Sequence, residues 1–317
     1  MLVKILGSAA GGAFPQWNCG CANCSAVRAG KLHGKARSQT QVAISHNGVG
    51  WFLLGASPDL RMQIEDNAFL HPSNGVRNSP VRGVVLASAD LDHVLGLLLL
   101  RELQPFTVYS TASVMRILRG GNSMFGMLNR VPDQVSWKSI APGSSFELME
   151  GDRATGLRCD VMTLCGRYPA YATGATFQNA GNGVATDGLV ESEASVGVFV
   201  TSSSGKSIAF LPAVSRFDDE LVQRLADSDV VMIDGTFWSD DELIRVHGSG
   251  KSARDMGHCP VGSSGGTLAQ LRTLSRPRKL FIHINNTNPM LNPESPEHRA
   301  VVDAGWEIAE DGWQLEV

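Results

Sequence analysis

Strand-like and helix-like segments alternate through both halves of the chain, and this alternation constrains the fold more than any other feature. Short apolar runs rich in β-branched residues have the length of strands, and the segments between them have helical patterns. Such interleaving predicts an α/β protein in which two sheets are covered on the outside by helices. The expected strands are 2–6, 40–45, 51–56, 82–87, 157–164, 195–201, 207–211, 229–234 and 279–284, and the expected helices are 58–66, 93–104, 217–227 and 265–274.

The organisation along the chain favours a single unit. No tandem repeat and no clear linker divides the 317 residues, so we expect one domain over 1–317. One stretch departs from the alternation. Residues 165–194 contain too many Gly, Ala, Asn and Thr for a regular element, which predicts an irregular surface insertion, with a lid as one interpretation.

Composition excludes several classes of protein. A net charge of −4 argues against nucleic acid as the main partner. No apolar run approaches the length of a membrane span, and the opening "MLVKILG" is typical of a first strand rather than of a signal peptide. We therefore expect a cytoplasmic protein whose six cysteines are metal ligands or core residues rather than disulfides.

Polar side chains with metal-binding chemistry stand at the ends of three expected strands. Asp92 and His93 follow the strand 82–87, Asp234 ends 229–234, and His283 lies in 279–284. In layered α/β folds, residues just past the carboxyl ends of strands line the usual crevice for ligands. Two carboxylates and two imidazoles there predict a site for one divalent cation.

Each of these residues also has an ordinary structural explanation. Asp92 is a suitable N-cap for the helix expected at 93–104, because its carboxylate can accept from free backbone N–H groups. Asp234 before Gly235 is a common junction between a strand and a turn, and a single histidine such as His283 often lies in a core. The shared placement at strand ends favours the metal site over these separate explanations.

Three of the six cysteines lie within six residues, in the stretch "NCGCANC". Cys19, Cys21 and Cys24 have spacings that allow one tight loop to direct three thiolates at a tetrahedral zinc ion. This predicts a structural Zn²⁺ that fixes a long loop. The fourth ligand is left open: Asn286 is a weak partner for zinc, and the other candidates are His247, His258, Cys259 and a water molecule.

Several motifs resemble the metallo-β-lactamase superfamily. The stretch "SADLDH" (88–93) stands where that fold carries an H-x-H-x-D-H loop, and "GASPDLR" (55–61) is similar to its early strand ending in Asp. Three further stretches resemble the family of pyrroloquinoline quinone (PQQ) biosynthesis B proteins, and the resemblance extends over nearly the whole chain. These are "GSAAGGAFPQWNCGCANC" (7–24), "RDMGH" (254–258) and "IHINNTNPML" (282–291). The resemblance implies an αββα sandwich of the metallo-β-lactamase type.

The chain departs from the hydrolase pattern at one of its two metal sites. Ser88 and Asp90 occupy the positions of the first two loop histidines, and no histidine occurs between residues 94 and 246. A dinuclear hydrolase uses both ions, so this mechanism would lose its bridging nucleophile. The resemblance implies that a single active-site metal remains, with Asp92, His93, Asp234 and His283 as its ligands.

The resemblance also implies roles for residues around that metal. His258 lies in a loop where related phosphodiesterases place a histidine near the reaction centre, and we expect it to handle protons or support a ligand. Asp59 is expected to hydrogen-bond a metal ligand rather than to bind the metal. Asn286 and Asn288 are expected either to bind substrate or to fold the "NNTNP" turn.

The function implied by the resemblance is PQQ biosynthesis. Two histidines with carboxylate ligands are typical of non-heme iron(II) enzymes, so we expect an oxygenase with an active-site Fe²⁺ that hydroxylates a tyrosine-derived ring of a small or peptide-derived precursor. The residues alone do not distinguish iron from zinc or manganese. A carrier of PQQ or its precursor is the alternative, and a metal-dependent hydrolase is third. The oligomeric state is open, with a homodimer as one expectation.

Overall fold

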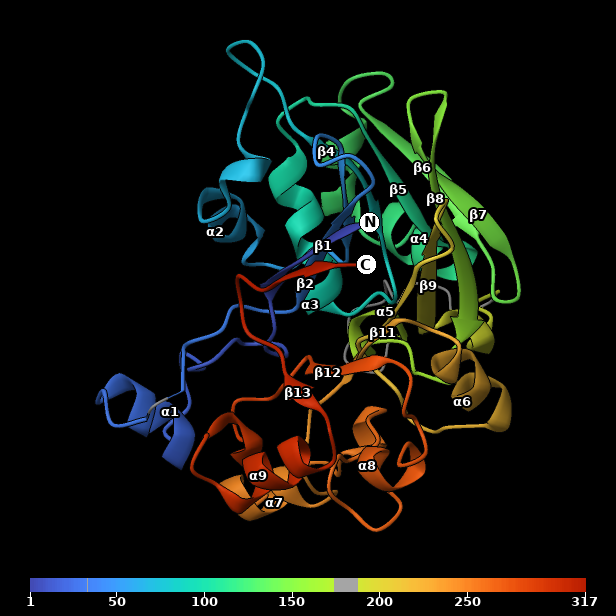
Figure 1. The fold of residues 1–317 in the computed structure, drawn as a ribbon. Coiled ribbons are helices and arrows are strands. Elements are labelled where there is room, and N and C mark those ends of the chain that lie inside the picture. Colours follow the sequence, from blue (N-terminus) through green and yellow to red (C-terminus); the bar gives the residue numbers. More distant parts are fainter. Residues whose placement is uncertain (33, 174–187) are drawn as a thin grey trace.

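The computed structural model describes residues 1–32, 34–173 and 188–317. Two seven-stranded sheets pack face to face, and helices cover the outer face of each sheet (Figure 1). The predicted αββα sandwich is therefore confirmed. Among the described residues, no helix combines the length and the apolar character needed to cross a bilayer.

The first sheet has the order β14-β1-β2-β3-β4-β5-β6. Its pairs are antiparallel from β14 to β3 and parallel from β3 to β6. The two termini pair at one edge, because β1 lies beside β14. The strands are β1 (Leu2–Gly7), β2 (Gln41–Ser45), β3 (Trp51–Leu54), β4 (Val81–Val85), β5 (Phe106–Thr111), β6 (Val135–Ile140) and β14 (Gln314–Glu316).

The second sheet has the order β13-β12-β11-β10-β9-β8-β7. It is parallel from β13 to β10 and antiparallel from β10 to β7, so it repeats the mixed pattern of the first sheet. The strands are β7 (Ser145–Glu150), β8 (Arg153–Thr163), β9 (Val196–Ser202), β10 (Ser207–Leu211), β11 (Val230–Asp234), β12 (Arg278–Ile282) and β13 (Glu307–Ile308).

The helices are short, and most of them lie against the outer faces of the sheets (Figure 1). The α-helices are α1 (Ala22–Arg28), α2 (Leu60–Glu65), α3 (Leu91–Val94), α4 (Ala112–Arg119), α5 (Ala170–Thr173), α6 (Asp219–Ala226), α7 (Glu242–His247), α8 (Thr267–Gln270) and α9 (Pro296–Asp303). The 3₁₀ helices are η1 (Ala68–Leu70), η2 (Leu95–Leu100), η3 (Ser123–Asn129), η4 (Glu191–Glu193), η5 (Arg254–Met256) and η6 (Pro289–Leu291).

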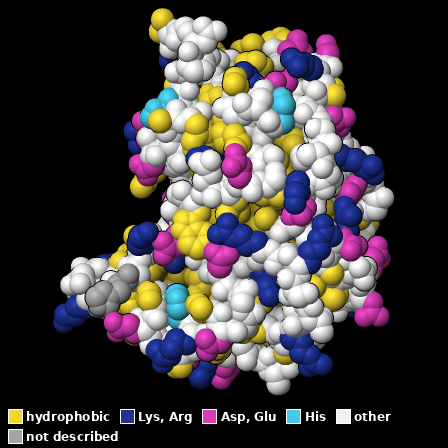
Figure 2. Space-filling view, in the orientation of Figure 1, with side chains coloured by type: hydrophobic (Ala, Val, Ile, Leu, Met, Phe, Trp, Pro, Cys, Tyr) yellow, Lys and Arg dark blue, Asp and Glu magenta, His cyan; other side chains and the backbone are white. Residues whose placement is uncertain are grey.

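Three apolar clusters fill the three interfaces between the four layers of the sandwich. The central cluster lies between the sheets and joins side chains such as Val3, Phe52 and Phe210 from both of them. The other two clusters lie under the helices on the outer faces of the two sheets. Figure 2 shows basic and acidic side chains interspersed on the face in view.

The helix expected at 93–104 is where the structure differs most from the sequence-based prediction. The chain forms a single turn, α3, and then the 3₁₀ helix η2. Gly96 explains the tight packing here, because a Cβ atom at this residue would lie 2.3 Å from the carbonyl oxygen of Ser57. The segment thus packs closely against the loop that follows β3. The sequence analysis also did not identify β5, α4 and β6.

The stretch predicted as an irregular insertion, 165–194, is described at its two ends. It contains the short helices α5 and η4, which the sequence did not predict. Tyr168 and Tyr171 pack against the outer cluster of the first sheet. Residues 174–187 of this stretch lie outside the described residues, and the lid interpretation of 165–194 stays a prediction.

Candidate metal centre

The polar residues predicted at strand ends come together where strands of the two sheets end. Asp92 and His93 lie in α3, a few residues beyond β4 of the first sheet. Asp234 is the last residue of β11, and His283 directly follows β12 of the second sheet. Because β11 and β12 are parallel neighbours, their carboxyl ends meet at one edge, as expected for this type of fold.

Asp92, His93 and His283 form a compact group whose ligand atoms all lie within 4.8 Å of one another. We call this group the first triad. The Nε2 atom of His283 lies 3.0 Å from Oδ2 of Asp92. The Nε2 atom of His93 is buried and has no hydrogen-bond partner in the described part of the chain. A buried ring nitrogen without a partner beside a carboxylate and a second imidazole fits a bound cation.

The backbone of His283 is in the left-handed region, with a φ of 54°. This conformation is uncommon for a residue with a side chain and often marks a functional site. The Thr236 hydroxyl lies 2.9 Å from the His283 carbonyl oxygen, and the Asn285 amide donates to the Thr236 carbonyl over 3.1 Å. These contacts between the turns after β11 and β12 fix the direction of the imidazole.

Asp234, His258 and His283 form a second group, the second triad, which shares His283 with the first. Oδ2 of Asp234 accepts from Nδ1 of His258 over 2.7 Å and from the Val214 amide over 3.0 Å. Its Oδ1 accepts from the hydroxyl and the amide of Thr236 over 2.5 and 3.0 Å. Among the described residues, the four predicted ligands thus fall into two overlapping groups that share His283, and the Asp234 oxygens accept from His258, Thr236 and Val214.

The protonation of these side chains follows from their contacts. Burial alone would raise the pKa of Asp92, but His93 and His283 outweigh it and hold the pKa below its ordinary value. Burial lowers the pKa of His93, and this favours the neutral imidazole that binds metals. Burial opposes the charged form of His258, yet the adjacent Asp234 carboxylate raises the pKa of His258 above its usual range.

A cavity of about 610 Å³ opens onto both triads. The guanidinium of Arg167 lies in its wall and donates over 3.3 Å to the Asp255 carbonyl, which connects the segment before α5 to the loop carrying His258. The Tyr171 hydroxyl, on α5, donates to the carbonyl of Ala89 next to the first triad. Other residues of the wall are Gly11, Gln39, Asp90, Met256 and Asn285.

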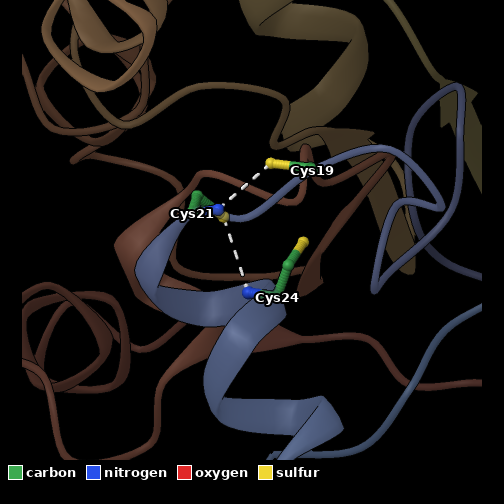
Figure 3. A group of neighbouring side chains, drawn as sticks. All are labelled: Cys19, Cys21 and Cys24. Carbon is green, nitrogen blue, oxygen red and sulfur yellow. Dashed lines mark hydrogen bonds between the residues drawn. The ribbon is translucent and has the colours of Figure 1, made fainter.

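The three clustered cysteines also form a compact group, with their sulfurs within 4.8 Å of one another. Figure 3 shows Cys19 on the loop before α1, Cys21 at the start of this helix and Cys24 in its first turn. The side-chain amide of Asn286 faces the group, 3.3 Å from the Cys24 sulfur and 3.6 Å from the Cys21 sulfur. Burial raises the pKa of the Cys21 thiol to about 11, which disfavours the thiolate in the absence of a cation. A bound cation would stabilise the thiolate and lower this pKa.

Comparison with known proteins identifies the family. A family model described as a beta-lactamase superfamily domain matches residues 50–284. Coenzyme PQQ synthesis protein B from Acinetobacter baumannii (strain ACICU) is 38% identical over 317 residues, which cover 100% of both chains. The protein of the same name from Methylorubrum populi is also 38% identical over 100% of both chains. The chain belongs to the coenzyme PQQ synthesis protein B family.

Solved structures agree with this assignment. The crystal structure of Zn²⁺-bound PqqB from Methylobacterium extorquens aligns over 100% of both chains, with a TM-score of 0.88 and 38% identity. A diphosphatase from the PhnP family aligns over 100% of this chain and 97% of its own, with a TM-score of 0.64 and 18% identity. This second likeness shows the shared fold alone. The suspected resemblance to PQQ synthesis protein B is thus confirmed.

Four of the residues predicted for the active site are not part of the cavity wall: Asp234, whose contacts are given above, and Asp59, Asn286 and Asn288. Asp59 accepts from the backbone amide of Gln39 over 2.8 Å and from its side chain over 3.1 Å, so it supports a residue of the wall rather than a metal ligand. Asn288 is fully buried and donates to the Gly235 carbonyl over 2.9 Å, which holds the turns after β11 and β12 together. Asn286 contacts the cysteines instead of the cavity.

Glu242 is a buried carboxyl that the sequence analysis missed, because the acidic stretch "SDDEL" is typical of a solvated helix start. It accepts from the Thr287 hydroxyl over 2.5 Å and from the Trp238 amide over 2.6 Å. Thr287 lies between Asn286 and Asn288. Glu242 therefore fixes the turn that reaches both the cysteines and β11, and burial raises its pKa to about 7.

We expect this carboxyl to make stability depend on pH. Because the folded state raises its pKa from 4.5 to about 7, the contribution is complete below pH 4.5 and is lost as the pH rises through about 7. The loss is about 3 kcal/mol of unfolding free energy. In Glu242→Gln the amide oxygen can accept from the Trp238 amide and the NH2 group can donate to the Thr287 hydroxyl, so the variant should remove this part of the pH dependence without losing either contact. Urea unfolding at acidic and alkaline pH measures it, and equal pH dependence in both proteins would contradict the assignment.

Proposed function

We propose that this protein acts in the biosynthesis of coenzyme PQQ as an iron(II)-dependent oxygenase that hydroxylates a tyrosine-derived ring of the precursor. The observation that carries the proposal is the first triad, in which two histidines and one carboxylate surround a common position. This ligand set is typical of non-heme iron(II) oxygenases, which keep open positions for dioxygen and substrate. The names of the full-length relatives support the pathway.

The neighbouring metal site of the fold supports a mononuclear centre. Ser88 and Asp90 stand where a dinuclear hydrolase would carry histidines, and the Ser88 hydroxyl donates over 2.7 Å to Oδ2 of Asp90. The Ser88 hydroxyl also contacts Nδ1 of His93 over 3.0 Å, so these two positions do not offer a nitrogen-rich second site. A hydrolytic mechanism with a hydroxide between two ions lacks ligands for one of them.

The proposal assigns separate roles to the metal ligands, to His258 and to Arg167. Asp92, His93 and His283 hold the ion, and iron(II) bound there would supply the activation of dioxygen. His258 accepts or releases protons in the cavity through Nε2, because Asp234 holds its Nδ1 over 2.7 Å. Arg167 in the cavity wall offers a guanidinium to a carboxylate of the substrate. The substrate is a small or peptide-derived precursor of PQQ.

The cysteine group carries a second proposal. Cys19, Cys21 and Cys24 hold a structural zinc ion, and the side chain of Asn286 contacts two of their sulfurs. Asn23 donates over 3.1 and 2.9 Å to the carbonyls of Asn286 and Asn288, so α1 is tied to the same turn. The zinc would fix a loop that has little regular structure of its own.

Anaerobic reconstitution tests the oxygenase. Protein stripped of active-site metal receives Fe²⁺ or Zn²⁺, then a tyrosine-containing precursor, isotopically heavy dioxygen and ascorbate as the two-electron reductant. We expect the iron protein to place one heavy oxygen atom on the ring while the second leaves as water, and the zinc protein to be inactive. Mass spectrometry of the product measures the incorporation.

Other outcomes identify other functions. Oxygen-independent turnover by the zinc protein would contradict the oxygenase and favour a hydrolase. Tight binding of PQQ that persists in Asp92→Ala, with no turnover by the intact iron protein, would favour a carrier instead. Heavy oxygen delivered from water rather than from dioxygen would also overturn the proposal.

A further inference from the structure

Two buried hydroxyls lie against the imidazoles of the first triad. The Ser88 hydroxyl oxygen is 3.0 Å from Nδ1 of His93, and the Thr236 hydroxyl oxygen is 2.8 Å from Nδ1 of His283. All four side chains are buried. Each hydroxyl therefore contacts the ring nitrogen that faces away from the centre of the triad. Ser88 follows a strand of the first sheet and Thr236 follows a strand of the second, yet in both contacts a hydroxyl oxygen faces an Nδ1 atom.

The hydrogen atom of the Ser88 hydroxyl has an acceptor other than the histidine. Ser88 donates to Oδ2 of Asp90 over 2.7 Å, and its oxygen also accepts from the Asp90 amide over 3.2 Å. A hydroxyl has one hydrogen and two lone pairs. Since the carboxylate takes the hydrogen, the contact with His93 is a hydrogen bond only if Nδ1 of His93 donates.

The same reasoning applies to Thr236. Its hydroxyl lies 2.5 Å from Oδ1 of Asp234 and 2.9 Å from the carbonyl oxygen of His283, and both of these atoms only accept. It also lies 3.2 Å from Nδ1 of His258, which donates to Asp234 over 2.7 Å and so cannot take the hydroxyl hydrogen. Whichever oxygen takes the hydrogen, Nδ1 of His283 must donate to the Thr236 oxygen. Both imidazoles thus carry hydrogen on Nδ1 and, when neutral, a lone pair on Nε2.

This arrangement leaves three acceptors around one position. Nε2 of His93 has no partner among the described residues, and Nε2 of His283 lies 3.0 Å from the carboxylate of Asp92. Two acceptors at that distance repel each other unless a proton or a cation lies between them. A cation satisfies all three atoms at once, whereas a proton satisfies only the pair of His283 and Asp92.

We propose that Ser88 and Thr236 are positioning residues that select the Nδ1–H tautomers of His93 and His283 and so present both Nε2 lone pairs to the metal. The inference rests on the metal site of the proposed function, but not on which metal binds or which reaction follows. Ser88 occupies the position of a histidine ligand in the hydrolases of the fold. Ser88 thus provides no ligand for the metal site that the hydrolases have there, and instead it supports His93 in the first triad.

The affinity for Mn²⁺ alone tests the inference, because this ion suits imidazole and carboxylate ligands better than thiolates. Free Mn²⁺ is counted by electron paramagnetic resonance during titration of the protein that retains its cysteine-bound metal. We expect Ser88→Ala and Thr236→Val to raise the dissociation constant about 10–100-fold. Thr236→Ser keeps the hydroxyl and should bind Mn²⁺ nearly as the parent does.

Ser195 provides a matched control. It pairs with Ser88 across a β-bridge and is also buried, but its hydroxyl has no partner in the described part of the chain. Ser195→Ala should therefore leave the Mn²⁺ affinity within about two-fold of the parent, well below the effect expected for a lost partner of a ligand. Thermal unfolding of each variant shows whether it is folded.

Nitrogen NMR of the histidine rings gives a second readout that a general loss of structure would not mimic. In the metal-free parent, His93 should carry its hydrogen on Nδ1, and in Ser88→Ala it should become a mixture of tautomers. An unchanged Mn²⁺ affinity in folded Ser88→Ala, or hydrogen on Nε2 of His93 in the parent, would overturn the inference. If the parent binds no Mn²⁺, the metal site of the proposed function fails, and the NMR result still decides the tautomer.

Discussion

His93→Ala is expected to abolish binding of the active-site metal and the oxygen-dependent activity, while zinc in the cysteine group is retained. The imidazole is one of three ligands in the first triad, and its Nε2 atom has no other partner among the described residues. Loss of a direct ligand should exceed the 10–100-fold loss of affinity that follows removal of an outer partner. Metal analysis of the purified variant and the hydroxylation assay measure the two effects.

Two further variants make this result specific. Asp92→Asn keeps the size of the side chain but removes its charge, so it should also lose the metal while the fold persists. His71→Ala removes a histidine whose ring contacts the Glu65 carbonyl over 3.0 Å, away from both triads, and should keep full metal content. Retention of the active-site metal in folded His93→Ala would show that the first triad is not the binding site.

Cys24→Ser is expected to remove the structural zinc and to destabilise the protein. Cys24 is fully buried between the start of α1 and the turn after β12. We expect a loss of about 2–3 kcal/mol, which lowers the melting temperature by about 3–5 °C for a chain of this size. Differential scanning calorimetry and zinc analysis measure both changes. Cys165→Ser, outside the cysteine group, should keep the zinc and most of the stability.

Cys24→Ser should also lower the affinity of the active site for its metal, through an indirect effect. Asn286, which faces the cysteines, is three residues beyond His283, and Asn23 ties α1 to this turn. Loosening the turn therefore reduces the precision with which His283 is held. We expect a smaller loss of metal affinity than in His93→Ala. Equal zinc content in Cys24→Ser and Cys165→Ser would contradict the assignment of the zinc to this group.

Much of the site could be predicted because its residues stand at positions that the sequence marks. Asp234 and His283 stand at the ends of apolar runs and Asp92 follows one by a few residues, and parallel strands bring such ends to one edge. The cysteines are close in sequence, so their meeting needs only a local loop. The pattern of strands and helices likewise predicted the layers, since each short apolar run had to be buried by another layer.

Contacts between distant segments could not be predicted in the same way. The hydrogen bond between Asp234 and His258 joins residues that the helices α7 and η5 separate, and it gives Asp234 a role in holding His258. Asn286 lies against cysteines more than two hundred residues away in the chain. Ser88 and Thr236 are small polar residues near turns, a pattern too common to indicate a function.

The most direct test of the account is the metal content and ligand set of protein purified without oxygen, measured by elemental analysis and X-ray absorption at the iron edge. The account predicts about one zinc bound by sulfur and about one iron bound by nitrogen and oxygen per chain, with the iron signal lost in His93→Ala. Zinc alone in the active protein, or iron that remains bound in His93→Ala, would contradict it.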